Sequence, residues 1–215
     1  MPPKTLIFDL DGTLIDSAGD LHRCVNHALA QYSLEPLSLE VVRGMIGDGV
    51  RQLLSRAFAA RSHPIEDIEV RRFMAYYSLD PVALTAPYEG VSGTLHELSR
   101  RGFRMAVCTN KPQAISKDVL QRVHLAPYFK HVLGGDSRPY RKPDPRLLLD
   151  VVELMKSPIE DCVLIGDSEV DAETATAAGV PFVLMTYGYR RGPAKQIAAV
   201  ARLRRFAQLV SQFSG

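Results

Sequence analysis

The sequence lacks the features that mark membrane-spanning and secreted proteins. Among its 215 residues, no apolar stretch approaches the roughly 18–20 residues that are needed to cross a bilayer. The five residues before the first predicted strand contain no apolar segment of the kind found in secretory signal peptides. We therefore expect a cytoplasmic protein that has no membrane partner.

Cysteine is scarce, and its spacing excludes two kinds of structural site. The three cysteines are Cys24, Cys108 and Cys162, and none of them forms a Cys-x-x-Cys pair. An odd number of widely spaced cysteines suits neither a disulfide framework nor a zinc site. We expect reduced and buried thiols, as is usual for proteins of the cytosol.

A large excess of charge of either sign is also missing, because the formal net charge is +2. The charges are unevenly placed, since the segment from Tyr189 onward contains six basic residues and no acidic one. These residues are Arg190, Arg191, Lys195, Arg202, Arg204 and Arg205. Such a run is more often the solvated face of a terminal helix than a contact with nucleic acid. No signature of a nucleic-acid-binding fold accompanies it, so we expect no nucleic-acid partner.

What the sequence does contain is an alternation of strand and helix patterns. Short apolar runs predict strands at residues 6–8, 104–108, 131–133, 162–165 and 182–185. Between the first two strands the spacing is helical throughout, with helices predicted at 17–34, 38–46, 49–60 and 65–79. Further helices are predicted at 91–101, 114–123, 145–155 and 170–178. The alternation predicts an α/β fold with a doubly wound, mainly parallel, Rossmann-like sheet. We expect a core of residues 1–16 and 86–215 and an inserted helical cap of residues 17–85.

Two aspartates, Asp9 and Asp11, directly follow the first predicted strand and precede the turn residue Gly12. The carboxyl ends of parallel strands form the edge at which open α/β sheets bind ligands. Two carboxylates this close together suit a hard cation such as Mg²⁺, or one of them can attack phosphorus as a nucleophile. A strand that simply ends in a capped turn is the alternative.

Polar residues also follow the later strands. Thr109 and Asn110 come directly after the strand at 104–108, where their side chains and backbone N–H groups could hold phosphate oxygens. Capping of the next helix is the alternative for this pair. Lys142 precedes Pro143, and the stiffened backbone suits an ammonium held against a carboxylate and a phosphoryl group. Most lysines are instead simply solvated.

The fourth polar cluster contains Asp167 and Asp171, which lie four residues apart after the strand at 162–165. The spacing indicates Asp167 as a metal ligand and Asp171 as a residue behind it that orients metal-bound water or Lys142. Acidic residues favour helix N-termini in any case. That preference does not explain four polar clusters that each follow a strand.

In this order, the four clusters resemble the four motifs of the haloacid dehalogenase superfamily of phosphohydrolases. The matching strings are Asp9-Leu10-Asp11-Gly12-Thr13, Thr109-Asn110, Lys142-Pro143 and Gly166-Asp167-Ser168-Glu169-Val170-Asp171. The predicted helical insert occupies the position of the mobile cap in that superfamily. The resemblance implies that Asp9 forms an aspartyl-phosphate and that Asp11 acts as general acid and then general base. It also implies Mg²⁺ held by Asp9, the Asp11 backbone carbonyl and Asp167, with Thr109, Asn110 and Lys142 binding the phosphoryl oxygens.

Within the superfamily, the chain is most similar to the phosphoglycolate phosphatases, through strings that include residues 16–21, 43–51 and 87–91. It departs from their commonest pattern at Glu89, where a proline is usual. The resemblance implies a small phosphate ester as substrate. Because phosphoglycolate carries a carboxylate, we expect Arg51 in the cap to bind it. We expect a monomer or a homodimer.

Three other functions stay open at this point. A phosphatase of another small metabolite, such as a sugar phosphate or pyrophosphate, would share all four motifs. Related β-phosphoglucomutases place a histidine in the first cap helix where this chain has Leu21, and His22 lies about 100° further around the helix. This displacement argues against a mutase. A binding protein without catalytic activity would have no need for the intact set of catalytic residues.

Overall fold

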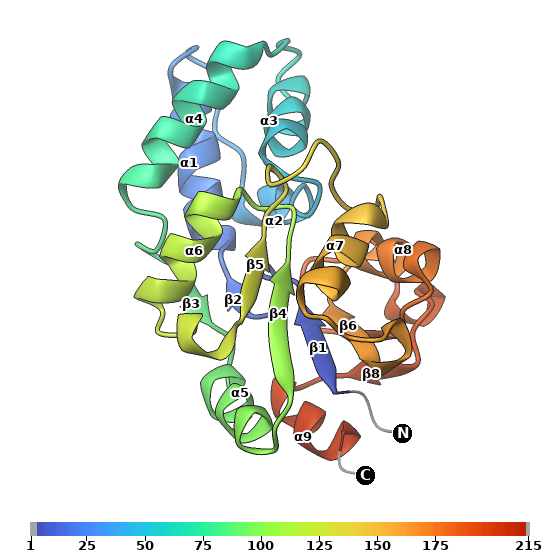
Figure 1. Cartoon of the computed structure of the whole chain (residues 1–215). Coiled ribbons are helices and arrows are strands. Elements are labelled where there is room, and N and C mark those ends of the chain that lie inside the picture. The colour runs from blue at the N-terminus through green and yellow to red at the C-terminus, as the bar shows by residue number, and fades with distance from the viewer. Residues whose placement is uncertain (1–3, 214–215) are drawn as a thin grey trace.

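The computed structural model describes residues 4–213, and its centre is a six-stranded sheet in the order β5-β4-β1-β6-β7-β8 (Figure 1). All neighbouring strands of this sheet run parallel. The strands are β1 (Thr5–Phe8), β4 (Arg104–Cys108), β5 (His131–Leu133), β6 (Cys162–Gly166), β7 (Phe182–Met185) and β8 (Ala201–Leu203). The central strands β1 and β6 are buried along their whole length, as is typical of a parallel sheet covered on both faces.

Helices cover the two faces of the sheet, and the side chains of β1 alternate between them. Leu6 and Phe8 pack in the cluster that contains residues of α5 (Val91–Arg100), α6 (Gln113–Arg122) and α9 (Leu209–Gln212). Ile7 packs on the opposite face with residues of α7 (Arg146–Leu154) and α8 (Glu169–Ala178). This two-sided packing confirms the doubly wound architecture. The described residues 4–213 also contain four short 3₁₀ helices: η1 (Ala126–Tyr128), η2 (Ile159–Asp161), η3 (Ala194–Gln196) and η4 (Phe206–Gln208).

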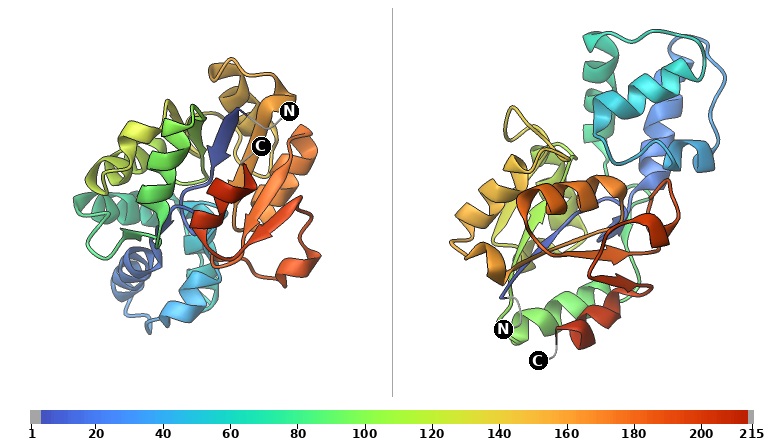
Figure 2. Two further views of the ribbon diagram at one scale, coloured as in Figure 1. Left: turned by 90° about the horizontal axis from the view of Figure 1, so that it is seen from below. Right: turned by 90° about the vertical axis from the view of Figure 1, so that its right-hand side faces the viewer.

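A helical cap stands over the carboxyl ends of the strands (Figure 2). It consists of α1 (Ala18–Ala30), α2 (Leu39–Arg43), α3 (Val50–Ala59) and α4 (Asp67–Leu79). Its two connections to the core pair with each other as the short antiparallel strands β2 (Ile15–Asp16) and β3 (Ala86–Pro87). The cap boundaries expected at residues 17 and 85 fall beside this ladder.

Asp20 fastens the two connections together. Its Oδ2 atom accepts hydrogen bonds from Leu84 N and Thr85 N, both at 2.9 Å, and from Thr85 Oγ1 at 2.8 Å. Its Oδ1 atom accepts from Arg23. Because the Asp20 side chain is completely buried, this carboxylate ties the first cap helix to the segment that returns to the core.

The end of the chain differs from the expectation of a terminal helix that carries the basic residues. Arg202 lies in β8, which extends the sheet next to β7, and Arg204 and Arg205 follow that strand. The exposed Arg202 and the buried Leu203 alternate as in any edge strand, but three residues are too few for this pattern to stand out in a sequence.

The cysteines and the helices of the described residues show two further features. Cys24, Cys108 and Cys162 are buried and form no disulfide. No helix within residues 4–213 combines the length and the apolar character required to span a bilayer.

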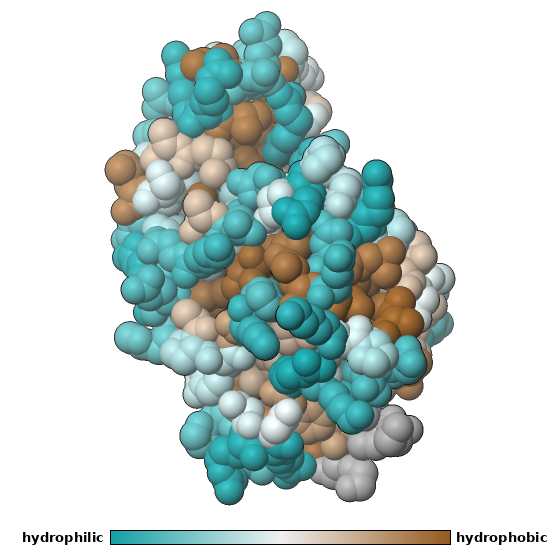
Figure 3. All heavy atoms as spheres, viewed as in Figure 1, coloured by the Kyte–Doolittle hydropathy of each residue, from teal (hydrophilic) through white to brown (hydrophobic). Residues whose placement is uncertain are grey.

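On the face seen in Figure 3, apolar side chains gather over β5 and α7, at the free edge of the sheet. Leu149 and Leu154 of α7 contribute to this surface.

Candidate active site

Three of the predicted strand-end clusters meet around the ammonium group of Lys142. Its Nζ atom lies 2.7 Å from Asp9 Oδ1 and 2.6 Å from Asp171 Oδ1. All three side chains are at least nine-tenths buried. The structure therefore brings together residues that are more than 130 positions apart in the chain, as expected for loops at one edge of a parallel sheet.

Asp9, Asp167 and Asp171 form a compact carboxylate cluster, in which each residue offers one oxygen within 4.8 Å of the others. Burial raises the pKa of Asp9 to about 6, with Asp171 adding to the effect and Lys142 opposing it. Burial, together with the charges of Asp171 and Asp9, raises the pKa of Asp167 well above its ordinary value. Three carboxylates thus face a single ammonium, an excess of negative charge that suits a divalent cation.

The hydrogen bonds within the cluster separate the roles of its members. Asp171 Oδ2 accepts from Ser168 Oγ at 2.6 Å and from the backbone N–H groups of Ser168 and Asp167. Its Oδ1 is occupied by Lys142. Three donors thus hold Oδ2 and Lys142 holds Oδ1, so Asp171 is suited to keep Lys142 and the loop in position.

Asp167 sits in a cradle built from two glycines and two donors. Its Oδ1 accepts from Thr13 Oγ1 at 2.8 Å, and its Oδ2 accepts from the backbone N–H of Tyr189 at 2.6 Å. A Cβ atom at Gly12 or Gly188 would overlap the Asp167 carboxylate. Gly12 also has a φ of +91°, which favours glycine.

Asp11 lies at the border between core and cap. Its carboxylate accepts from Ser17 Oγ at 2.6 Å and from Lys111 Nζ at 2.9 and 3.1 Å. Lys111 Nζ also donates to the Tyr77 hydroxyl of α4 at 2.5 Å. Although burial disfavours the charged form, the negative charge of Asp11 raises the pKa of Lys111 above its ordinary value.

Sequence reasoning did not single out Lys111 or Tyr77. Lys111 directly follows Asn110, and this position was the one available signal. The sequence contains no signal for Tyr77, because an aromatic residue in an amphipathic helix is typical of the core.

Thr109 and Asn110 lie directly after β4, as predicted, and their side chains make different hydrogen bonds. The Thr109 hydroxyl oxygen accepts from the backbone N–H of Lys111 at 3.2 Å, so its proton is left to donate. Asn110 Nδ2 donates to Gly47 O of the cap at 3.0 Å and to Lys142 O at 2.9 Å. Both amide protons of Asn110 are thus engaged, and in this structure the side chain joins core and cap.

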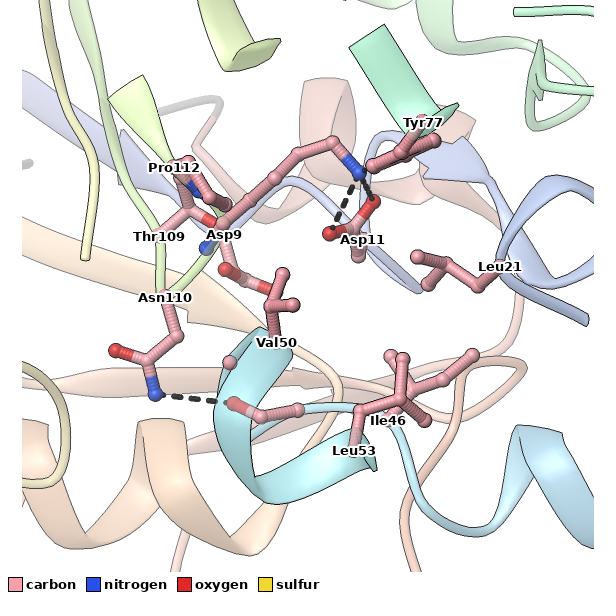
Figure 4. A pocket seen from close by; sticks show the side chains of 13 residues that line it. Asp9, Asp11, Leu21, Ile46, Val50, Leu53, Tyr77, Thr109, Asn110 and Pro112 are labelled. Atoms are coloured by element: carbon pink, nitrogen blue, oxygen red, sulfur yellow. Dashed lines mark hydrogen bonds and ion pairs between the residues drawn. The ribbon is translucent and has the colours of Figure 1, made fainter. Parts of the chain in front are cut away.

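A pocket of about 40 Å³ lies between the core loops and the cap (Figure 4). Asp9 and Asn110 lie on one side of it, and Leu21 and Leu53 of the cap lie on the other. His22 belongs to the interior of the cap, where its Nε2 atom lies at hydrogen-bonding distance (2.9 Å) from Leu37 O.

Arg51 is placed away from this pocket. It lies in α3, its guanidinium pairs with Asp67 at the start of α4, and its side chain is 47% exposed. Arg51 is not among the residues between 4 and 213 that line the pocket. The structure therefore does not bring it together with the other predicted site residues.

Known proteins share both the sequence pattern and the fold. The family model for haloacid dehalogenase-like hydrolases matches residues 6–185. A phosphoglycolate phosphatase from Cereibacter sphaeroides (strain ATCC 17025) is 46% identical over 193 residues, which cover 87% of each chain. One from Rhodospirillum rubrum is 40% identical over 215 residues, covering 96% of this chain and 89% of the relative.

Among solved structures, a predicted phosphoglycolate phosphatase from Haemophilus somnus 129PT superposes with a TM-score of 0.92 at 30% identity, covering 97% of each chain. The family match spans all four motifs and the cap, and it agrees with the convergence of Asp9, Lys142 and Asp167 at one sheet edge. The chain belongs to the haloacid dehalogenase-like hydrolases.

Proposed function

We propose that this protein is a Mg²⁺-dependent phosphatase that hydrolyses 2-phosphoglycolate to glycolate and phosphate. The observation that carries the reaction type is the buried contact of Asp9 with Lys142 beside two further carboxylates. The substrate is supported by relatives named phosphoglycolate phosphatase that are 40–46% identical over most of the chain. The partner is thus a small phosphate ester, and we propose a cytoplasmic monomer or homodimer.

In the first half of the reaction, a carboxylate oxygen of Asp9 attacks phosphorus and forms an acyl-phosphate bond while the bond to the ester oxygen breaks. Lys142 holds Asp9 Oδ1 at 2.7 Å, which fixes the orientation of the nucleophile. Asp11 supplies the proton that the departing alkoxide takes up. Lys142 and the Thr109 hydroxyl stabilise the phosphoryl oxygens as negative charge develops on them.

In the second half, a water molecule attacks the phosphorus of the aspartyl-phosphate, and Asp11 accepts its proton. The bond to Asp9 breaks, which releases phosphate and restores the carboxylate. The cap covers one side of the pocket and limits the access of bulk water during the first half.

Asp9, Asp167 and the backbone carbonyl of Asp11 are the groups that would hold Mg²⁺. When bound, the ion would reduce the repulsion between the anionic nucleophile and the anionic phosphate, two unit charges that repel by about 4 kcal/mol at ~4 Å and an effective dielectric of 20. The crowding of carboxylates that raises the pKa of Asp9 and Asp167 fits such a cation.

The size of the pocket favours a small leaving group. At about 40 Å³, the pocket leaves little room beside the phosphoryl group. Glycolate fits this limit better than a hexose. Leu21 lines the pocket at the position where the related mutases have a histidine. An apolar residue there argues against mutase activity.

The test is phosphate release from a panel of esters, with Mg²⁺ and with EDTA. The panel contains 2-phosphoglycolate, glucose 6-phosphate, β-glucose 1-phosphate, pyrophosphate and p-nitrophenyl phosphate. We expect metal-dependent turnover with the highest kcat/KM for 2-phosphoglycolate. A higher value for pyrophosphate or a sugar phosphate would overturn the substrate, and conversion of β-glucose 1-phosphate to glucose 6-phosphate would overturn the reaction class.

A further inference from the structure

The pocket contains one cation that the reaction scheme leaves without a role. Among the residues that line it within the described range 4–213, Lys111 is the only one with a cationic side chain. It is 4% exposed, although a buried ammonium is costly unless a partner compensates it. Its partners are Asp11 of the core and Tyr77 of the cap.

The chemistry of the substrate determines where its carboxylate lies. In 2-phosphoglycolate, one methylene group separates the ester oxygen from the carboxylate carbon. The ester oxygen has to approach Asp11, because Asp11 protonates it. One methylene group therefore separates the substrate carboxylate from the oxygen that approaches Asp11, the side chain that Lys111 contacts at 2.9 and 3.1 Å.

The other walls of the pocket offer no cation for this carboxylate. The cap contributes no cationic side chain: its lining residues are Leu21, Ile46, Gly47, Gly49, Val50, Leu53 and Tyr77. Lys142 is already shared by Asp9 and Asp171. A carboxylate buried here without a cation would lose its hydration with little in return.

We propose that Lys111 is the specificity residue that binds the carboxylate of the substrate, with Tyr77 holding its ammonium in place. This proposal rests on the proposed function, and it gives to Lys111 the role that the sequence suggested for Arg51. An ammonium has three donors. One meets the Tyr77 hydroxyl, and the substrate carboxylate takes over one of the contacts that Asp11 makes in the structure.

The arrangement also couples recognition to the cap. Lys111 belongs to the core loop after β4, whereas Tyr77 belongs to α4 of the cap. The ammonium is fully positioned only while the cap is closed, as it is here.

The test compares two substrates that differ only at the recognised group. 2-Hydroxyethyl phosphate has the same phosphate, ester oxygen and first methylene as 2-phosphoglycolate, with a hydroxymethyl group in place of the carboxylate. For Lys111→Met we expect kcat/KM to fall about 100-fold further for 2-phosphoglycolate than for 2-hydroxyethyl phosphate, with a higher KM. The matched control is Lys117→Met, which removes an exposed lysine of α6 and leaves the ratio unchanged.

Equal losses for both substrates would overturn the proposal, since they would mean that Lys111 only positions Asp11. A selective loss in Arg51→Met would also overturn it. If Lys111→Met does not fold, Lys111→Gln keeps a polar side chain without the charge and should show the same selective loss. Failure of the wild-type protein to hydrolyse 2-phosphoglycolate would instead refute the proposed function, so the two failures are distinguishable.

Discussion

Lys142 and Asp171 form a buried ion pair with an Nζ–Oδ1 distance of 2.6 Å, and this pair supports the nucleophile. Asp171 is itself held by Ser168 at the start of α8, where the two residues form a capping box. The chain of contacts runs from a helix N-terminus through Asp171 and Lys142 to Asp9. It connects the position of the nucleophile to the regular structure of the core.

Replacing Lys142 should separate its catalytic role from its structural role. Lys142→Met leaves Asp9 and Asp171 buried without their cation, and we expect the free energy of unfolding to fall by about 3–5 kcal/mol. Turnover of 2-phosphoglycolate should fall by about 10³-fold or more, because the oxygens of the transition state lose their counter-charge. Denaturant unfolding and phosphate release measure the two effects.

The double variant Lys142→Met with Asp171→Asn is the control for that experiment. It removes one of the two uncompensated carboxylates, so part of the lost stability should return while activity stays absent. Activity of Lys142→Met near the wild-type level would contradict the role given to this residue.

Removal of the metal should lower the stability of the wild-type protein. At a Mg²⁺ concentration of 100 times Kd, binding to the folded state alone stabilises it by about 2.7 kcal/mol. Asp167→Asn removes a ligand and also relieves the carboxylate crowding that raises the pKa of Asp167. We expect a higher Tm than the wild type in EDTA and almost no further increase with Mg²⁺. A Mg²⁺-dependent Tm shift of wild-type size in Asp167→Asn would place the metal elsewhere.

The carboxylate of Asp20, which joins the two connections between cap and core, should give a distinct pH dependence. Burial opposes its ionisation, but hydrogen bonds from Leu84, Thr85 and Arg23 hold the pKa of Asp20 below its ordinary value. A depressed pKa contributes stability above the unfolded-state value of about 3.9, and this contribution is lost as the pH falls through the folded-state value.

Asp20→Asn should therefore cost about 2 kcal/mol at pH 7 and progressively less as the pH falls below about 4. Urea unfolding of both proteins across this range measures the difference. A loss of unfolding free energy in Asp20→Asn that stays constant down to pH 3 would show that the charge of Asp20 does not stabilise the connections between cap and core.

The positions of the central strands and of the main site residues could be predicted because both follow from local patterns. Buried parallel strands read as apolar runs, and one topological rule brings their carboxyl ends together. Asp9, Lys142, Asp167 and Asp171 meet for this reason. The cap residues follow no such rule, because their direction depends on how four helices pack on one another and on the core.

Arg51 illustrates this limit. Its position beside a glycine turn of the cap made it a reasonable partner for a carboxylate, but α3 directs it to Asp67. Lys111 follows two predicted site residues. Its contacts with Asp11 and Tyr77 could not be predicted, because they depend on how the cap packs on the core. The strand β8 was missed because a three-residue edge strand has too little pattern to recognise.

The central claim is that Asp9 attacks phosphorus, and the most direct measurement is phosphate release from 2-phosphoglycolate by Asp9→Asn at saturating Mg²⁺. The substitution keeps the shape of the side chain and removes its nucleophilic charge. We expect a folded protein with no turnover above background, beside a wild-type protein that is active with Mg²⁺ and inactive with EDTA. Sustained Mg²⁺-dependent turnover by folded Asp9→Asn would contradict the account.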